Sequence, residues 1–222
     1  VKWTTTMVNA GTQHNVIPDA CSFVVDIRSN ECYSNEEIFE ILQTKLQSEI
    51  KARSFRLSSS SISVDHPIVK KIKSMGRNLF GSPTLSDQAL MRFPSVKFGP
   101  GDSSRSHTAD EYIVESEIEE AVEMYRRILS KQDDKSVVII TVGFSTTMAQ
   151  LLQSQPDKYS KLSGRELVAK KVKYFSAMAG EFNIPDFAEY NVFNDLEAAR
   201  TLFETSPVPI VFTPWLMGEL TQ

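Results

Sequence analysis

Ser136 to Phe144 reads SVVIITVGF, a continuous apolar run that decides the fold of the second half of the chain. A run of this kind is typical of a strand in a parallel sheet that is covered on both faces. Beyond it, segments with helical and strand patterns alternate. The predicted helices cover residues 146–153, 163–173 and 195–204, and the predicted strands cover 174–179 and 208–213. This repetition predicts an α/β fold with a doubly wound parallel sheet, whose ligands meet the carboxyl ends of the strands.

The first half of the chain has a different pattern, which predicts an α+β portion. Residues 1–8 and 21–28 alternate polar and apolar side chains, so we expect a β-hairpin, with Cys21 as a small core residue. Ser34 and Glu37 predict a capping box at the start of a helix. The predicted apolar stripe of that helix is Ile38, Leu42, Leu46 and Ile50, and residues 53–64 are expected to return as a strand. One exposed strand edge of this small sheet is suited to a dimer.

The middle of the chain predicts two further helices around a loop. Pro67 begins a helical pattern that ends near Gly81, and short strands are expected at 84–91 and 95–98. Ser116 and Glu119 predict a second capping box, before a helix with acidic residues first and Arg126 and other basic residues last. We place the domain boundaries at 1–64, 65–120 and 125–222.

Composition excludes several classes of function. The chain has 222 residues, 41% of them hydrophobic, and a formal net charge of -4. Lys and Arg are scattered and form no basic stripe, so we expect no nucleic acid or membrane partner. The two cysteines have no CxxC spacing, which favours free thiols and a cytoplasmic location.

The loop from Phe98 to Tyr112 reads FGPGDSSRSHTADEY and contains several side chains that could bind a ligand or a metal ion. Its Gly-Pro-Gly sequence predicts a tight turn after an apolar strand, where ligands are often bound. His107 is a candidate metal ligand, with Asp110 or Glu111 as acceptors that fix its tautomer. The alternative interpretation, a surface histidine in a solvated loop, has equal weight, since one histidine is not a metal cluster.

Five stretches of the first 120 residues resemble the co-catalytic zinc aminoacylases, the group that contains acetylornithine deacetylase and succinyl-diaminopimelate desuccinylase. They are SPTLSDQALM at 82–91, VKFGPG at 96–101, SHTADEY at 106–112, GTQHNVIPD at 11–19 and VDIR at 25–28. The last two resemble the lid and dimerisation domain of that family, and the first three resemble the carboxy-terminal end of its catalytic domain. The resemblance implies a partial metallopeptidase domain and a homodimer formed through the lid.

This resemblance also implies a chemistry and a set of site residues. The chemistry is zinc-dependent hydrolysis of an N-acyl amino acid, with His107 as a zinc ligand. Gly99 and Gly101 would shape the substrate loop, and Arg28 would hold the substrate carboxylate by a bidentate pair. Asn15 or His14 would stabilise the tetrahedral oxyanion.

The second half resembles the inosine-uridine type nucleoside hydrolases. The stretches that carry the resemblance are GFSTTMA at 143–149, MAG at 178–180 and AEYNV at 188–192, followed by DLEAA at 195–199. The resemblance implies calcium bound by the backbone carbonyl of Thr146, and ribose hydroxyls held by Asn183, Glu189 and Asn191. Glu and Asn side chains can satisfy vicinal hydroxyls, and calcium accepts carbonyl oxygens. The chain departs from the family pattern at Phe144-Ser145, at Thr147 and at Ala179.

Both likenesses are incomplete, and the two meet within residues 116–131. The aminoacylase family needs an upstream H-x-D pair, a bridging Asp and a Glu-Glu, and the nucleoside hydrolase family needs an amino-terminal Asp cluster. We find neither set, so no catalytic set is complete. We therefore expect a hydrolase-derived chain that is incomplete as a catalyst. The alternatives are a calcium-dependent nucleoside N-ribohydrolase and a non-catalytic, chimeric product that dimerises through the lid.

Overall fold

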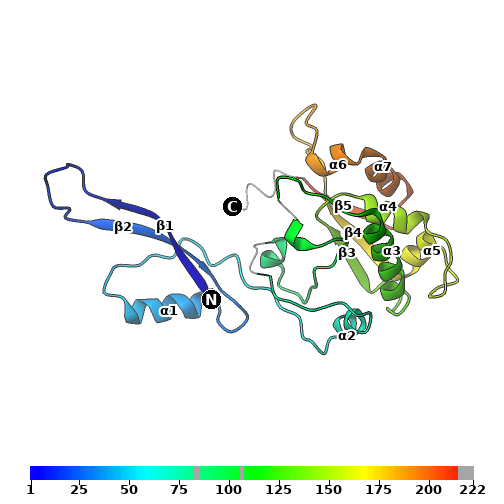
Figure 1. The fold of residues 1–222 in the computed structure, drawn as a ribbon, viewed down its shortest axis with the longest axis horizontal. Coiled ribbons are helices and arrows are strands. Elements are labelled where there is room, and N and C mark those ends of the chain that lie inside the picture. Colours follow the sequence, from blue (N-terminus) through cyan, green and yellow to red (C-terminus); the bar gives the residue numbers. More distant parts are fainter. Residues whose placement is uncertain (83–85, 106–107, 215–222) are drawn as a thin grey trace. The chain divides into compact units, whose positions relative to one another are not determined.

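The computed structural model describes residues 1–82, 86–105 and 108–214. The chain divides into two compact units, Val1–Lys97 and Phe98–Gln222 (Figure 1). One contains a two-stranded antiparallel sheet and the other a three-stranded parallel sheet, so the expected mixture of α+β and α/β structure is confirmed. Within the described residues, every helix is too short or too polar to cross a membrane.

The first unit begins with the predicted hairpin. Strand β1 (Lys2–Ala10) pairs antiparallel with β2 (Cys21–Arg28), and the register shifts at a bulge between Thr5 and Met7. Helix α1 (Asn35–Lys45) begins with the predicted capping box. The Ser34 hydroxyl accepts from the Glu37 N–H at 3.1 Å, and the Glu37 carboxylate accepts from the Ser34 N–H at 2.7 Å.

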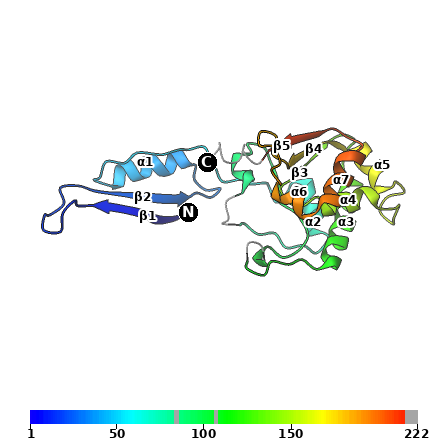
Figure 2. The ribbon, with the colours of Figure 1, turned by 90° about the horizontal axis from the view of Figure 1, so that it is seen from above.

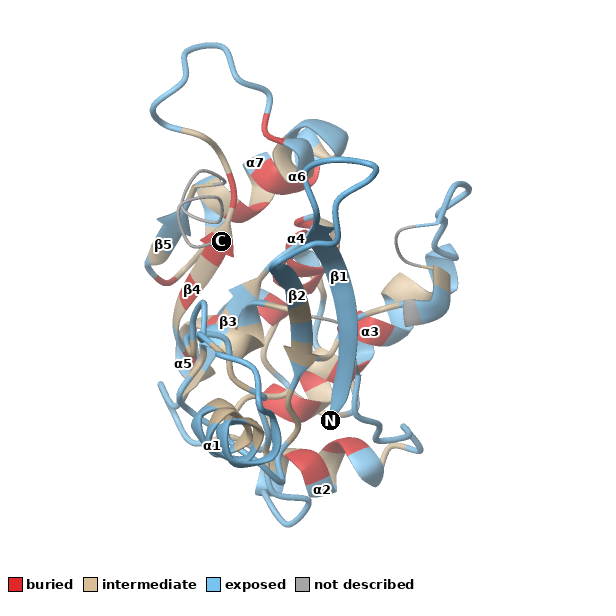
Figure 3. Ribbon diagram, turned by 90° about the vertical axis from the view of Figure 1, so that its left-hand side faces the viewer, coloured by how far each residue is buried: buried red, intermediate tan, exposed pale blue. Residues whose placement is uncertain are grey.

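The hairpin buries little of its surface. Figure 3 shows β1 as exposed and β2 as exposed or half-buried. Val25 and Ile27 are half-buried, whereas Phe23 and Cys21 on the same face of β2 are exposed. The prediction that Cys21 is a core residue is therefore wrong. A two-stranded sheet with one short helix cannot cover the whole length of an apolar strand face, so the far end of this face stays open to solvent.

Two other predictions for this unit are wrong. Helix α1 ends at Lys45, so Ile50 lies beyond the helix that was expected to contain it. Residues 53–64 form no strand, because part of their backbone bonds to side chains instead of to a neighbouring strand. The Asn35 amide donates to the carbonyls of Phe55 at 3.3 Å and Leu57 at 2.6 Å.

The region between the two sheets has less regular structure than we predicted. Helix α2 (Pro67–Lys73) begins at Pro67 as expected, and His66 caps it by accepting from the Ile68 N–H at 3.3 Å. It ends well before Gly81. In the described residues 86–98 a 3₁₀ helix, η1 (Asp87–Leu90), takes the place of the predicted strands. Short-range backbone bonds such as Ala89 N–H to Ser86 carbonyl, at 2.9 Å, close it into turns.

The second unit follows the predicted alternation closely. After η2 (Ser103–Arg105), its elements are α3 (Glu115–Leu129), β3 (Val137–Thr141), α4 (Thr146–Gln153), α5 (Gly164–Lys171), β4 (Val172–Met178), α6 (Tyr190–Asn194), α7 (Leu196–Thr205) and β5 (Ile210–Thr213). The strand order is β3-β4-β5 and both pairs are parallel. The five-residue helix α6 was not predicted.

Helix α3 begins differently from our prediction. It starts at Glu115, and the carboxylate of Glu117 accepts from the Val114 N–H at 3.0 Å. Glu117 also forms an ion pair with Arg105. The predicted capping box of Ser116 and Glu119 is therefore wrong, because both residues lie inside the helix.

The core of this unit lies on one face of the sheet. Phe175 of β4 is fully buried against side chains of α3, α4, α5 and α7, and Figure 2 shows α3, α4 and α7 on one side of the three strands. On the other face Val138 and Ile140 of β3 are 39% and 36% exposed. The prediction that β3 is covered on both faces is wrong among the described residues, because the helices that form the core pack on one face only.

Candidate active site at the strand ends

The start of α4, which follows β3, is tied to the start of α7. The hydroxyl of Thr146, the first residue of α4, donates to the carboxylate of Asp195. The other oxygen of Asp195 accepts from the Ala198 N–H at 3.2 Å and so caps α7. Two helix starts, separated by 49 residues in sequence, therefore meet at the edge where ligands bind in parallel sheets.

Glu189 organises the next part of this edge. Its side chain is buried, with the residue only 5% exposed. One carboxylate oxygen accepts from the Asn191 N–H at 3.0 Å, and the other from the Val192 N–H at 3.1 Å and the Gly180 N–H at 3.4 Å. Gly180 follows β4 with a φ of +79°, a backbone conformation that favours glycine. The carboxylate thus joins the end of β4 to the first turn of α6.

The two asparagines expected at a ribose lie in the same region. Asn191 is half-buried in the first turn of α6, and Asn183 is exposed in the loop between β4 and α6. Within the described part of the chain, neither side-chain amide has a hydrogen-bond partner. Both amides can therefore accept and donate to a ligand without first breaking a bond in the protein.

The described donors do not fit a calcium ion at this edge. The carbonyl of Thr146 lies in the first turn of α4, where carbonyls accept from backbone N–H groups further along the helix. The carboxylates of Glu189 and Asp195 already accept hydrogen bonds as helix caps. Among the described residues, no three His, Cys, Asp or Glu side chains form a group that could hold a metal ion.

The residues expected at a deacylase site belong to different units. Asn15 and His14 lie exposed in the hairpin loop, and Arg28, at the end of β2, forms an ion pair with Asp26 at 3.0 Å. These three belong to the first compact unit, whereas Gly99 and Gly101 belong to the second. His107 lies outside the described residues.

The Gly-Pro-Gly loop is anchored to α3. The Tyr125 hydroxyl donates to the Phe98 carbonyl at 3.0 Å, and the two rings meet edge to face at 5.1 Å. Arg105 pairs with Glu117 and lies over the ring of Tyr112 at 4.7 Å. Burial raises the pKa of Tyr125 to about 12. Gly101 has a φ of +80°, which agrees with the tight turn expected there.

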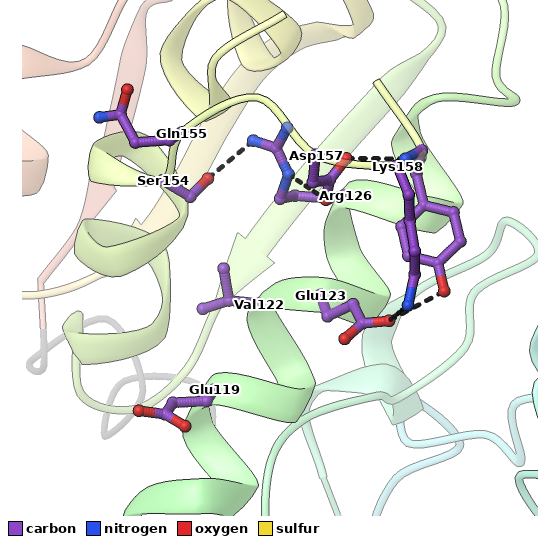
Figure 4. A pocket seen from close by; sticks show the side chains of 9 residues that line it. Glu119, Val122, Glu123, Arg126, Ser154, Gln155, Asp157 and Lys158 are labelled. Carbon is purple, nitrogen blue, oxygen red and sulfur yellow. Dashed lines mark hydrogen bonds and ion pairs between the residues drawn. The ribbon is translucent and has the colours of Figure 1, made fainter. Parts of the chain in front are cut away.

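Sequence reasoning missed the role of Arg126. The side chain was assigned to the basic end of a helix, yet the residue is only 2% exposed. It lies beside an open groove of about 350 Å³ (Figure 4). The groove is lined by Glu119, Val122, Glu123, Arg126, Ser154, Gln155, Asp157, Lys158 and Tyr159. The helical spacing from Val122 to Arg126 and Leu129 was the signal, since it puts Arg126 on the buried stripe.

Comparisons with known proteins agree with the two resemblances. Residues 1–54 match the model of the peptidase dimerisation domain, and residues 62–221 match that of the inosine-uridine preferring nucleoside hydrolase. The second match starts before the boundary between the compact units, at Lys97 and Phe98. The predicted combination of two families is therefore confirmed, although the family boundary and the compact boundary do not coincide.

Individual relatives come from both families. The chain is 27% identical over 129 residues to "Putative succinyl-diaminopimelate desuccinylase DapE" of Mycobacterium tuberculosis, covering 55% of the chain and 36% of the relative. It is 31% identical over 91 residues to the pyrimidine-specific ribonucleoside hydrolase RihA of Escherichia coli, covering 41% of the chain and 26% of the relative. The corresponding identity to RihA of an Enterobacter species is 32%.

Each of these matches spans about a third of the length of the relative or less. The nucleoside hydrolase model nevertheless covers well over half of the residues of the chain. The chain therefore belongs to the inosine-uridine preferring nucleoside hydrolase family, and its residues 1–54 are similar to a peptidase dimerisation domain.

Proposed function

We propose that the strand-end edge of the second unit binds the ribose of a nucleoside. The observation that carries this proposal is a pair of fixed helix starts: Thr146 bonds to Asp195 between α4 and α7, and Glu189 caps α6, where the amide of Asn191 is unpartnered. An amide offers both a donor and an acceptor, which is what a pair of sugar hydroxyls requires. Asn183 and Glu189 complete the proposed ribose contacts.

The proposed fold around this site is part of a doubly wound sheet, of which the described helices cover one face. The proposed domains are 1–64, 65–120 and 125–222. The resemblance to the two families implies a calcium ion beside Thr146 and a zinc ion bound by His107. The described donors at the strand ends do not fit calcium, so we assign it no step. If bound, such ions would polarise a substrate or a water molecule.

The chain by itself is proposed to bind a nucleoside without cleaving it at a substantial rate. Near the strand ends, the carboxylates of Glu189 and Asp195 are committed to helix caps and to Thr146, and that of Glu181 accepts from the Asn183 N–H at 2.8 Å. A general base needs a lone pair that reaches the water or the substrate. We infer that a second chain, or residues beyond those described, would supply it.

Titration with uridine tests the ribose site. We expect Asn191→Ala to weaken uridine binding at least about tenfold, because hydrogen bonds to a polar ligand are lost. Asn194→Ala is the matched control, since Asn194 lies on the same helix and its amide donates to the Tyr190 carbonyl at 2.8 Å. Equal affinity of wild type and the double variant Glu189→Ala/Asn191→Ala would contradict the proposal.

A specific observation also favours a homodimer formed through the hairpin. Trp3, Val8 and Phe23 are 61%, 67% and 52% exposed, and cross-strand pairing puts them on one face of the two strands. An exposed apolar patch of this kind marks an association surface, and the match to a peptidase dimerisation domain covers the same residues.

Light scattering of the purified chain tests the homodimer. We expect a defined dimer for the wild type and a monomer for Val8→Lys, because the added charge disfavours apolar contact and edge pairing. Gln43→Lys adds the same charge to the exposed surface of α1 and is expected to remain a dimer. A wild-type monomer would contradict this second proposal and leave the ribose site unaffected.

A further inference from the structure

The segment between Lys173 and Arg200 has a one-sided charge pattern. It contains no Lys, Arg or His, although the chain has 24 Lys and Arg residues among its 222. The carboxylates of Glu189 and Asp195 in this segment cap helices inside the protein. Its other acidic residues are Glu181, Asp186 and Glu197, and the last two are exposed. The surface of this segment is therefore negative, and no basic residue within the segment offsets the charge.

The loop between β4 and α6 exposes large apolar side chains beside two of these acids. Phe182, Ile184 and Phe187 are 67%, 44% and 41% exposed, and they lie between and next to Glu181 and Asp186 in the sequence. Figure 3 shows this loop as exposed over most of its length. Apolar side chains gathered on the surface of a folded chain mark a site of association.

A row of three aromatic rings connects the loop to the core of the second unit. Phe182 meets Phe212 of β5 edge to face, with ring centroids 6.2 Å apart, and Phe212 meets Phe203 of α7 in the same way at 4.9 Å. Phe203 packs against the core, whereas Phe212 is still 37% exposed. Edge-to-face pairs of this kind are favourable contacts. The exposed ring of Phe182 therefore rests on a packed base at the end of β5.

We propose that residues 181–187 together with Phe212 form a docking surface for a segment of another protein that presents apolar side chains flanked by lysine or arginine. Aromatic rings supply much of the binding energy in protein interfaces, and opposite charges around them raise the rate and the specificity of association. This inference goes beyond the proposed ribose site and does not depend on it. Asn183, a proposed ribose contact, lies in the same loop, so the tests measure peptide binding and not uridine binding.

Charge separates this partner from other occupants of the surface. A second copy of the chain that met this surface across a twofold axis would place Glu181 and Asp186 against the same two acids. Like charges that face each other across an interface disfavour association. An anionic lipid surface would repel the same carboxylates. A segment with basic flanks places a cation opposite each acid, so it is the occupant that the charges favour.

Fluorescence anisotropy with a labelled amphipathic peptide of leucine and lysine tests the apolar part of the surface. We expect Phe182→Ser to weaken binding of this peptide at least about tenfold, because an exposed ring at the centre of the contact is lost. Phe80→Ser is the matched control, since Phe80 is 75% exposed and belongs to the first unit. Equal affinity of the wild type and Phe182→Ser, or no binding by the wild type at about 100 μM peptide, a weak affinity by any standard, would overturn the proposal.

A second pair of variants tests the charges. Asp186 has a φ of +60°, which asparagine tolerates well, so Asp186→Asn removes the charge and keeps the turn. We expect it to slow peptide association about threefold and to reduce the salt dependence of binding. Glu40→Gln, on the exposed surface of α1, removes one charge elsewhere and is expected to change neither. Equal binding of a peptide with glutamate in place of lysine would overturn the role of charge.

The other occupants are outcomes of the same set of variants. Self-association of the wild type that Phe182→Ser abolishes and Phe80→Ser does not would assign the surface to a second copy of the chain. Binding to phosphatidylserine vesicles that Phe182→Ser abolishes would assign it to a lipid surface. Either result would overturn a basic protein partner. If the wild type binds the leucine-lysine peptide through Phe182 but binds no uridine, the ribose proposal fails and the docking surface stands.

Discussion

Arg126 of α3 donates from its Nε to the carboxylate of Asp157 at 2.7 Å, and the arginine side chain is only 3% exposed. The same guanidinium donates to the Ser154 hydroxyl at 2.8 Å (Figure 4), and to the Leu162 carbonyl at 2.9 Å. Asp157 in turn accepts from the backbone N–H groups of Tyr159 and Ser160 at 2.9 Å. One buried arginine therefore fastens the connection between α4 and α5 to the core of the second unit.

Replacing Arg126 by methionine is expected to lower the free energy of unfolding by about 3–5 kcal/mol, because it leaves the acceptors of the guanidinium without their partner. Arg200→Met is the control, since the pair of Arg200 and Glu204 is about two-thirds exposed and is expected to contribute less than about 1 kcal/mol. Urea denaturation monitored by circular dichroism measures both. A loss for Arg126→Met no larger than that of the control would show that the arginine does not hold the loop.

Stability is expected to depend on the ionisation of Asp157. Burial raises the pKa of this carboxyl, but the bonds from Arg126 and from the Ser160 and Tyr159 N–H groups outweigh it, so the pKa lies below its usual value. A carboxyl whose pKa is lowered by folding stabilises the fold at pH values above its unfolded-state pKa of about 3.9. This contribution disappears as the pH falls through the folded-state pKa. The stability difference between wild type and Asp157→Asn should be constant from pH 7 to 5 and shrink below pH 4, as followed by urea denaturation. A constant difference down to pH 2.5 would contradict this assignment.

Gly164 is expected to tolerate no side chain. A Cβ at this position would lie 1.6 Å from the Leu151 carbonyl oxygen, and the Gly164 N–H donates to the Ser154 carbonyl at 2.8 Å. We expect Gly164→Ala to destabilise the protein by about 3 kcal/mol, at the upper end of the cost of overpacking. Gly143→Ala meets no atom within 4 Å and should change the thermal unfolding midpoint little. Equal midpoints for the two variants would refute the close approach.

Tyr125 is expected to resist ionisation. Burial raises its pKa to about 12, so the neutral phenol stabilises the fold below pH 10 and this contribution is lost as the pH rises from 10 to 12. An absorbance titration should show one of the six tyrosines ionising near pH 12, and Tyr125→Phe should remove that step. The variant should also lose about 1–2 kcal/mol, because the Phe98 carbonyl loses its donor. Six tyrosines that all ionise near pH 10 would contradict the buried position.

The regular part of the fold was predictable because local signals agree there. The apolar run at 136–144, the helical spacing at 146–153 and the strand at 174–179 each correspond to an observed element. Residues 53–64 carry a comparable strand pattern, but a strand needs a partner, and the Asn35 amide occupies two of their carbonyls. Pairing between distant segments cannot be deduced from local alternation.

The sequence predicted which residues belong to the candidate site, but it did not predict the hydrogen bonds that they form. Glu189 and Asn191 were found through family resemblance, which says nothing about the three N–H groups around one carboxylate. Burial of Arg126 follows from helical spacing, but its partner Asp157 lies 31 residues away. Such contacts depend on tertiary packing, so they become visible only in the folded chain.

Chemical-shift mapping by NMR during titration with uridine tests the central claim most directly. We predict that the amide signals of Gly180, Asn191 and Val192 shift with uridine concentration, together with the side-chain signal of Asn191, while signals of Glu119 and Gln155 beside the Arg126 groove remain unchanged. Shifts confined to that groove, or no shifts at millimolar uridine, would contradict ribose binding at the strand ends.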